Sequence, residues 1–380
     1  GLTYYLYGAQ VNIGATAKTY FPTTDRLNVP RIDYTGGGCG KLLLEKQSTN
    51  LVTYSEDFNN AAWAKEDISV TANATTSPDG TTNADLLLPN TNNIDHSIYD
   101  QTNIATEAFT VFLKAGGYNY AFLGENNNVA ADGAFFDLAN GVVSQNTSTL
   151  AASIEDYGNG WYRCSLVGSF STNYRIICTS ENGTSFIHAG DGIKGVYAWG
   201  AQAESGSYAT SYIPTLASSV TRLADVASKT GISSLFGASA TSFFMDFEIT
   251  QVSNDSTWTV TGYDGSNLFS LCQFGAATNF PRIVFDGGVD TTLGTALSIG
   301  RHKIAVSFAT NDFRAYIDGV LVGTDTSCTY NQYDRISVNG TAWTGNTNNA
   351  NSFKLNQYAQ FPNVLTNDQL ADLTGGNKTT

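Results

Sequence analysis

The 380-residue chain is poor in the side chains on which most metal and catalytic sites depend. It contains three histidines, His96, His188 and His302, and its five cysteines form no CxxC pair. A zinc site needs clustered Cys and His ligands, and the GxSxG turn of many serine hydrolases is also missing. Carboxylates are plentiful, so a paired-carboxylate glycosidase stays open. We nevertheless expect a protein without enzymatic activity.

Charged side chains are scarce as well. They make up 14% of the sequence, against roughly 25% in typical soluble domains. The net charge of −14 argues against binding nucleic acid, which requires clustered Lys and Arg, and against docking on anionic lipid. No apolar run approaches the ~18–20 residues of a membrane span. Met245 is the only methionine, so we expect the chain to be processed, truncated or incomplete ahead of Gly1.

Thr, Ser, Asn and Gly therefore have to supply the polar surface, which suits exposed β-structure with many turns. Alternating patterns rich in β-branched and aromatic residues predict short strands. Between 50 and 214 the expected strands are 109–114, 120–123, 134–138, 161–170 and 174–180. Between 223 and 373 they are 243–249, 258–261, 268–274, 282–285, 302–308, 313–317, 320–322, 336–338 and 353–359.

Turn residues and caps join these strands. Asn140–Gly141 and Asp318–Gly319 predict tight hairpin turns. Residues 161–170 and 174–180 are expected to form a further hairpin. A short helix is expected at 366–373, with its N-cap in the Thr-Asn-Asp sequence that begins at Thr366.

The cysteines are too few for a disulfide-based scaffold. They are Cys39, Cys164, Cys178, Cys272 and Cys328. Cys164 and Cys178 flank the expected hairpin turn and could face each other, and Cys272 and Cys328 fall in one module. Because the count is odd and the density low, we favour free thiols over disulfides.

One segment of the sequence is repeated. Tyr5–Gln10 recurs as Tyr197–Gln202, and the match continues without a gap to Thr23 and Thr215, with nine of nineteen positions identical. The second copy closes a module, so we expect the first to be the same kind of strand and loop. It is either the remnant of a truncated tandem array, which we favour, or a strand that completes a sheet elsewhere by β-augmentation.

A set of separated motifs occurs in the first half of the chain. They are VPRIDY at 29–34, LLE at 43–45, NLVTYSEDF at 50–58, NGWYR at 159–163, WGAQ at 199–202 and YIPT at 212–215. In this order they resemble a module of phage tail-fibre and head-spike proteins. That module is similar to carbohydrate-binding jelly rolls of the galactose-binding type, and the resemblance implies the same fold here.

The second half resembles concanavalin A-like and laminin G-like jelly rolls. The motifs are KIAVSF at 303–308, RAYIDGVLVG at 314–323 and LTNDQL at 365–370. We therefore expect an all-β protein with two antiparallel β-sandwich (jelly-roll) modules in tandem and an N-terminal β segment. The expected boundaries are 1–28 for that segment, 29–225 for the first jelly roll and 226–380 for the second.

Aromatic residues make up 12% of the sequence, and exposed aromatic rings stack on sugars whereas buried ones pack cores. For Trp63, Trp161 and Trp199, which lie in the first module's motifs, we favour core packing. The candidates for glycan contact are Trp343, Trp258, Tyr118 and Tyr120, near Asn-, Thr- or Gly-rich turns.

Arg163, in the WYR motif, is the remaining glycan candidate. We favour a structural ion pair with a carboxylate for it over ligand contact. Jelly rolls of this kind often hold a structural calcium ion, bound by carboxylate and backbone oxygens. Glu56, Asp57 and Glu204 are the candidate ligands by position. No other cofactor is expected.

The resemblances imply a non-enzymatic virion surface protein, a fibre, spike or decoration protein, that binds host or environmental glycans. It would act at the virion surface or outside the cell as a homo-oligomer, with other virion proteins and cell-surface glycans as partners, and without nucleic acid or membrane insertion. One alternative is a subunit of a bacterial extracellular filament or adhesin assembled by strand exchange. Another is an accessory module of a polysaccharide-active enzyme.

Overall fold

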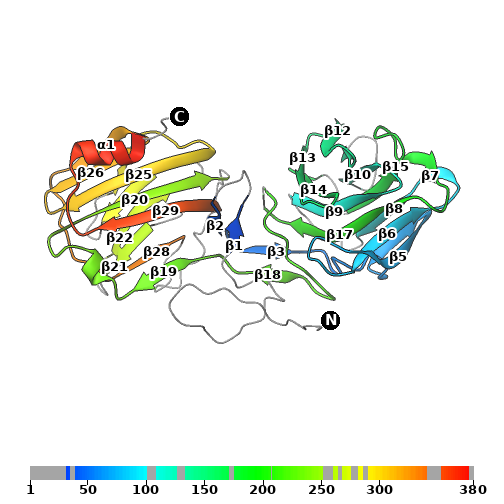
Figure 1. Ribbon diagram of the computed structural model, residues 1–380, viewed down its shortest axis with the longest axis horizontal. Helices are drawn as coiled ribbons and strands as arrows, with labels where there is room; N and C mark the ends of the chain where they lie inside the picture. Colours follow the sequence, from blue (N-terminus) through cyan, green and yellow to red (C-terminus); the bar gives the residue numbers. More distant parts are fainter. Residues whose placement is uncertain are drawn as a thin grey trace, which may run out of the picture.

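The protein, represented by a computed structural model, consists almost entirely of β-strands. The described residues are 31–34, 39–100, 108–125, 133–170, 175–206, 208–250, 260–263, 268–274, 281–285, 290–339 and 352–375. They form two β-sandwiches that lie side by side (Figure 1). The all-β fold class predicted from the sequence is confirmed.

The first sandwich contains two six-stranded antiparallel sheets. One, called the β9 sheet here, has the order β13 (Ala151–Asp156), β14 (Trp161–Val167), β9 (Ala108–Gly116), β17 (Gly195–Glu204), β6 (Ala84–Pro89) and β5 (Ile68–Thr75). The other has the order β12 (Val142–Asn146), β11 (Gly133–Asp137), β10 (Tyr120–Glu125), β15 (Arg175–Ser180), β8 (Ser97–Asp100) and β4 (Trp63–Glu66). Phe109 and Leu113 from the first sheet pack with Leu123 and Phe136 from the second, so the two sheets share one core.

Two short ribbons accompany this sandwich. β7 (Asn93–Asp95) pairs with β16 (Ile187–Ala189), and β3 (Ser48–Asn50) pairs with β18 (Val220–Arg222). The second ribbon lies between the two sandwiches (Figure 1). It therefore holds together the two points at which the chain enters and leaves the first sandwich.

The second sandwich pairs a seven-stranded sheet with a six-stranded one. The first has the order β1 (Arg31–Asp33), β2 (Lys41–Leu44), β29 (Phe353–Phe361), β20 (Ala240–Ile249), β25 (Gly300–Ala309), β26 (Asp312–Ile317) and β27 (Val320–Asp325). The second has the order β19 (Ala227–Thr230), β28 (Arg335–Val338), β21 (Val260–Tyr263), β22 (Leu268–Phe274), β23 (Pro281–Phe285) and β24 (Asp290–Thr292). Phe247, Val306 and Val338 belong to its core.

One α-helix, α1 (Asn367–Gly375), lies in the described part of the chain, where the sequence predicts it. The Gln369 backbone N–H donates to Thr366 Oγ1 over 3.2 Å, and the Thr366 N–H donates to Gln369 Oε1 over 2.9 Å. This reciprocal pair is a capping box, which satisfies two N–H groups at the helix start. Leu370 packs on Phe244 and Ala305, so the helix covers the outer face of the seven-stranded sheet.

The prediction that the first jelly roll begins at residue 29 differs from the structure, in which the first strands belong to the second sandwich. β2 pairs with β29, and Leu44 is buried in the core of the second sandwich. β1 and β2 therefore belong to the second sandwich, although they precede the first. The first sandwich is an insertion between β2 and β19, because long-range strand pairing rather than chain order decides membership of a sheet.

A buried charge network lies where the chain crosses between the sandwiches. Glu45, directly after β2, forms an ion pair with Arg222 at 3.1 Å and another with Arg31. Arg31 also pairs with Asp225. The Ser211 N–H, from the first sandwich, donates to Glu45 Oε1 over 2.9 Å. Glu45 thus binds groups from both modules.

The hairpin predicted for 161–170 and 174–180 is wrong. β14 pairs with β13 and β9, whereas β15 pairs with β10 and β8 in the opposite sheet. Cys164 and Ile177, one from each strand, both face the shared core, so the strands lie across the sandwich from each other. Cys39, Cys164 and Cys328 are free thiols, as favoured from the sequence. The side chains of Cys178 and Cys272 lie outside the described residues.

The second copy of the sequence repeat includes β17, a central strand between β9 and β6. The first copy, like the whole segment 1–28, lies outside the described residues.

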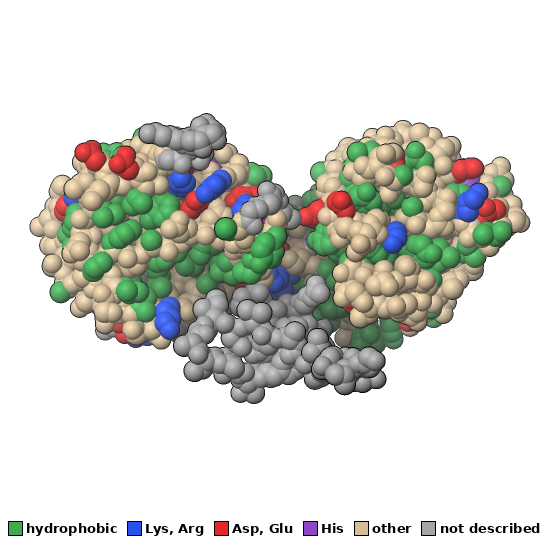
Figure 2. All heavy atoms as spheres, in the orientation of Figure 1, with side chains coloured by type: hydrophobic (Ala, Val, Ile, Leu, Met, Phe, Trp, Pro, Cys, Tyr) green, Lys and Arg blue, Asp and Glu red, His purple; other side chains and the backbone are tan. Residues whose placement is uncertain are grey.

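In the part of the chain that is described, no helix is long and apolar enough to cross a membrane. Figure 2 shows a face on which uncharged side chains predominate and several Lys or Arg side chains lie next to Asp or Glu.

Candidate functional site

Three neighbouring strands of the β9 sheet place aromatic and cationic side chains on the side opposite the core. Along β9 the core side chains Phe109, Val111 and Leu113 alternate with outward-facing ones, because successive side chains of a strand point to opposite faces. The strand register arranges the outward side chains in two rows across β14, β9 and β17. The rows are Trp161–Lys114–Tyr197 and Arg163–Phe112–Trp199.

The Phe112 ring is the centre of this group. Its centroid lies 5.2 Å from that of Trp199, 5.9 Å from that of Tyr212 and 4.8 Å from that of Tyr157. Trp199 and Tyr212 are themselves 4.8 Å apart. Tilted and edge-to-face contacts at such distances are the favoured aromatic geometries. We call the two rows, with Tyr157 and Tyr212, the aromatic face.

Arg163 is held inside this face rather than at its surface. Its guanidinium carbon lies 5.6 Å from the Phe112 ring centre, and Nη2 donates to Thr110 Oγ1 over 3.1 Å and to the Thr210 carbonyl over 2.6 Å. Among the described residues, Arg163 does not form the expected ion pair with a carboxylate. The partners of its guanidinium group are a hydroxyl, a carbonyl and an aromatic ring. Its Nε and the Trp199 Nε1 are buried and have no hydrogen-bond partner among the described residues.

A polar rim adjoins the aromatic face at Tyr212. The Tyr212 hydroxyl donates to Glu56 Oε1 over 3.1 Å, and Asn83 Nδ2 donates to Glu56 Oε2 over 3.0 Å. Burial raises the pKa of the Glu56 carboxyl above its ordinary value, although both hydrogen bonds oppose the shift. Burial, reinforced by the Glu56 charge, also raises the pKa of Tyr212. This rim therefore presents oxygen and amide groups beside aromatic rings.

Only part of the aromatic face reaches solvent. Trp161 and Trp199 are 2% and 4% exposed, whereas Tyr157 is 44% exposed and Tyr197, Tyr212 and Lys114 are half-buried. The tryptophans thus form a rigid base beneath tyrosines and one lysine. A surface of this kind offers flat apolar area for a sugar ring and polar groups for its hydroxyls.

The three tryptophans are buried, as the preference for core packing requires, but only Trp63 lies in the core shared by the two sheets, whereas Trp161 and Trp199 are buried on the outer side of the β9 sheet. Trp63 is likewise 2% exposed, and its Nε1 donates to the Tyr54 carbonyl over 3.1 Å. Trp161 Nε1 donates to the Thr76 carbonyl over 3.0 Å. These side chains stabilise the sandwich and are not available for direct stacking on a ligand.

The other aromatic candidates are scattered. Trp258 and Trp343 lie outside the described residues. Tyr118 is 6% exposed and packs edge-on against His188, with ring centroids 5.0 Å apart. Tyr120 is half-buried on β10, with its ring against Gly183. Neither tyrosine belongs to the aromatic face. Among the predicted glycan residues that the structure describes, only Arg163 lies in it.

The predicted calcium ligands have separate partners. Glu204, on β17, is 1% exposed and accepts hydrogen bonds from Ser48 Oγ and from the N–H and hydroxyl of Thr210. Glu56 belongs to the rim described above, and Asp57 is exposed near Asn60. No group of three or more metal-ligating side chains occurs within the described ranges. Calcium binding by these three residues stays a prediction.

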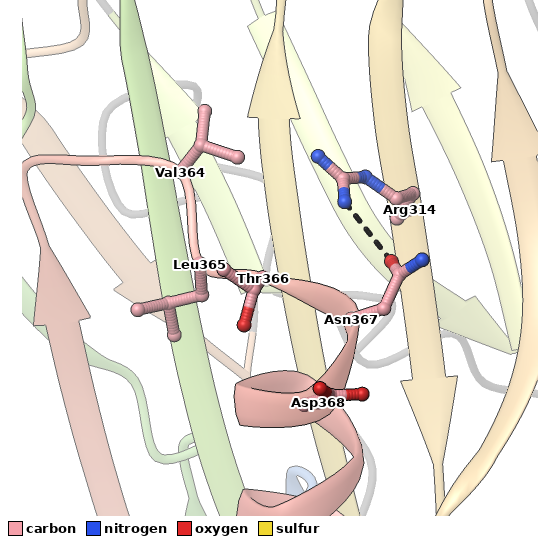
Figure 3. Close-up of a pocket in the computed structure, with 6 residues that line it drawn as sticks. All are labelled: Arg314, Val364, Leu365, Thr366, Asn367 and Asp368. Carbon is pink, nitrogen blue, oxygen red and sulfur yellow. Dashed lines mark hydrogen bonds between the residues drawn. The ribbon is translucent and has the colours of Figure 1, made fainter.

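An open depression of about 370 Å³ lies where α1 begins (Figure 3). It is lined by Arg314 and by the residues from Val364 to Asp368. The Arg314 guanidinium points toward Asn367 and donates to its Oδ1 over 2.9 Å, while its other nitrogens bind Asp312. Because the Arg314 guanidinium is already paired with Asp312, the depression is a weaker candidate for a binding site than the aromatic face.

Sequence reasoning missed five members of the aromatic face. They are Phe112, Lys114, Tyr157, Tyr197 and Tyr212. The period-two pattern of 109–114 already separates Phe112 and Lys114 from the core residues of β9. Their alignment with Trp161 and Tyr197 depends on the pairing register, which is set between distant segments. That register is not visible in a single sequence.

Comparisons with known proteins found similarity only to solved structures, and only at the level of the fold. No protein-family model and no curated protein matches the chain. A solved structure of the CBM40 module of the Ruminococcus gnavus IT-sialidase bound to α2,3-sialyllactose is 15% identical, with a TM-score of 0.31, over 38% of this chain and 91% of that one. The K499G mutant of NanB sialidase from Streptococcus pneumoniae is 13% identical, with a TM-score of 0.30, over 38% of this chain and 26% of that one.

The native heptameric SAP-like pentraxin from Limulus polyphemus is similar to the same extent. It is 9% identical, with a TM-score of 0.30, over 38% of this chain and 75% of the pentraxin. At such identities and TM-scores these similarities carry no argument about activity. The case for a function has to come from this chain's own residues.

Proposed function

We propose that the chain is a non-enzymatic, glycan-binding surface protein and that the aromatic face of the first sandwich is its binding surface. The observation that carries the proposal is the contact of exposed Tyr157 with Phe112, which packs with Trp199 and half-buried Tyr212 on the outer side of a sheet. Outer sheet faces are normally polar when they meet solvent. Tyr157 and Tyr197 are the aromatic side chains that meet solvent here beside the buried rings, and exposed rings held in place in this way suit a ligand with apolar faces.

The physical chemistry of the face supports a sugar as that ligand. A pyranose ring has an apolar face that stacks on an aromatic ring and hydroxyls that need hydrogen-bond partners. Tyr157 and Tyr197 offer the rings, and the Glu56–Asn83 pair offers polar groups. Because the tyrosines rest on packed tryptophan and phenylalanine rings, little side-chain freedom is lost when a ligand binds.

The virion as the site of action rests on the sequence motifs of the first half, which resemble tail-fibre and head-spike proteins. In this proposal the protein is a fibre, spike or decoration protein, forms homo-oligomers and displays its sandwiches outside the cell. Its partners are other virion proteins and cell-surface glycans. The sparse charge, 14% of residues, is compatible with such an exposed β-protein.

A glycan array probed with the full chain tests this function. We expect selective binding to one or a few glycans. Tyr157→Ala and Tyr197→Ala should each weaken binding by about tenfold, as expected for loss of an interface anchor. Tyr34→Ala is the matched control, because Tyr34 is 67% exposed next to β1, on the second sandwich. Equal binding by all variants, or release of sugar products from the bound glycan, would contradict the proposal.

A second candidate function is a strand-linked assembly subunit. The repeat supports it, because its second copy contains β17, which is hydrogen-bonded on both sides within a six-stranded sheet. A first copy with the same sequence pattern suits a sheet that lacks this strand. Electron microscopy of native assemblies tests this candidate: residues 4–23 inserted in a neighbouring sheet would support it, and residues 4–23 packed on their own chain would oppose it.

A further inference from the structure

Lys114 occupies an unusual position for a lysine in this acidic chain. It lies on β9 between Trp161 on β14 and Tyr197 on β17, in the first row of the aromatic face. Its ammonium nitrogen is 6.0 Å from the Trp161 ring centre, and the side chain is half-buried. A cation over an indole ring is attracted by the electron density of the ring face.

Carboxylates pair with three of the described lysines, whereas Lys114, like Lys46 and Lys65, has no such pair. Lys41 lies 2.6 Å from Glu248, and Lys354 lies 2.6 Å from Asp33. Lys194, close in space to Gly117, pairs with Asp191 at 3.2 Å. Lys114 forms no ion pair with a described carboxylate, although Asp and Glu outnumber Lys and Arg by 33 to 19.

A second cation with the same property lies in the adjoining row. Arg163 donates to Thr110 and to the Thr210 carbonyl, and it too has no ion pair with a described carboxylate. Glu155 on β13 is the cross-strand neighbour of Arg163, but its side chain is exposed and forms no ion pair with either cation. Two positive charges thus share one partly buried face without an ion pair to a described carboxylate. Their fields add there, and the low-dielectric aromatic surroundings strengthen the attraction for an incoming anion.

The surroundings also leave the Lys114 side chain accessible. Gly160, at the turn before β14, has φ +78°, and a Cβ atom built there would lie 3.6 Å from Lys114 Cε. A side chain at 160 would therefore occupy the space beside the lysine stem. With glycine at this position, that space is open to a ligand.

We propose that the ligand of the aromatic face is an acidic saccharide, one whose sugar rings carry a carboxylate, and that Lys114 receives the carboxylate. This inference rests on the proposed function, because it assigns the ligand class of the same face. The sugar ring stacks on Tyr197 or Tyr157, and its carboxylate accepts a charge-assisted hydrogen bond from Lys114 Nζ. Such bonds are about twice as strong as neutral ones.

Matched pairs of ligands test the inference. Uronic-acid oligosaccharides, such as oligogalacturonate and hyaluronan fragments, are compared with their carboxyl-reduced, neutral counterparts. Binding to the full chain is measured by calorimetry at low salt and at about 0.15 M salt. We expect at least one acidic oligosaccharide to bind about tenfold more tightly than its neutral counterpart, with the difference shrinking as salt rises.

Lys114→Gln should remove that difference by lowering the affinity for the acidic member of the pair about tenfold, to the level of its neutral counterpart. Lys229→Gln, at an exposed lysine on β19 of the second sandwich, is the matched control and should behave as the unmodified chain. Equal affinity for acidic and neutral members of a pair would overturn the inference and leave the proposed function standing. Failure to bind any glycan, on an array or in these pairs, with an intact circular dichroism spectrum would overturn both.

Discussion

Arg222 and Glu45 form an ion pair of 3.1 Å between two side chains that are at most 8% exposed. Glu45 follows β2 of the second sandwich, and Arg222 ends β18, through which the chain leaves the first. Burial alone would raise the pKa of Glu45, but Arg222 and Arg31 hold it below its ordinary value. The pair therefore keeps a buried carboxylate charged at the junction of the two modules.

Glu45→Gln should destabilise the protein strongly. The substitution keeps the side-chain shape but removes the ion-pair partner of buried Arg222 and one of the two carboxylates that pair with Arg31. Breaking a buried pair in this way costs about 3–5 kcal/mol in comparable cases. Urea denaturation measures the loss, and Glu155→Gln at an exposed position of β13 is the control. Because the folded pKa of Glu45 is lowered, its stabilisation is present above about pH 4.3 and is lost as the pH falls through the folded value. A variant as stable as the unmodified chain would contradict this role.

Two histidines should shift stability with pH in opposite directions. Burial and the neighbouring His96 lower the pKa of His188, so the unfolded chain binds its proton more readily and stability falls as the pH drops below about 6.5. The hydrogen bond with Asp318 raises the pKa of His302, so its stabilisation is present below about pH 6.5 and is lost as the pH rises through the folded value.

Urea midpoints between about pH 5 and about pH 8 check both effects, since this is the range in which histidines titrate. His188→Gln should flatten the acidic side of the profile, and His302→Gln should flatten the alkaline side. Each variant serves as the control for the other. An acidic limb unchanged by His188→Gln would show that the burial of this imidazole does not set the pH response.

Gly200 should be sensitive to substitution for two separable reasons. It has φ +63°, and a Cβ atom would lie 3.0 Å from Phe112 Cδ2 and 3.2 Å from Tyr212 Cζ. Gly192 has φ +68° but open space around it. Gly192→Ala should therefore cost about 1–2 kcal/mol for the left-handed backbone alone. Gly200→Ala should cost more and also weaken glycan binding, because Phe112 and Tyr212 have to move.

Denaturation and glycan binding of the two alanine variants are compared side by side. Equal losses of stability, with glycan binding intact in both, would mean that the Phe112–Tyr212 contact does not shape the binding face.

Leu44 tests the insertion of the first sandwich into the second. Leu44 is 3% exposed in the core of the second sandwich, and Leu87 is fully buried in the core of the first. Leu44→Ala should destabilise the second sandwich by about 2–5 kcal/mol. Hydrogen exchange should then accelerate in β20, β25 and β29 and not in β9 and β17, whereas Leu87→Ala should give the reverse pattern. Faster exchange in β9 on Leu44→Ala would contradict the assignment of β2.

Local signals made much of the fold predictable. The alternation of 109–114 identifies β9, the Asp318–Gly319 pair takes the positive φ values of the β26–β27 turn, and Thr366 caps α1 as its sequence context indicates. Each of these features depends on residues within a few positions of one another. Local chemistry was sufficient in these cases.

Long-range pairing was not predictable in the same way. The β1–β2 hairpin joins β29, more than 300 positions along the sequence, and β14 and β15 lie in opposite sheets although a short connection joins them. The candidate site has the same origin, since Lys114 meets Trp161 and Tyr197 only through the strand register. Arg163 was found from its motif, whereas its partners were not.

The most direct test of the account is a crystal structure of the full chain with a glycan identified on the array. The account predicts electron density for a sugar ring against Tyr157 or Tyr197, with polar contacts to Lys114 or to the Glu56–Asn83 pair. Density for the sugar on the second sandwich, or at another face of the first, would contradict the claim that the aromatic face is the binding surface.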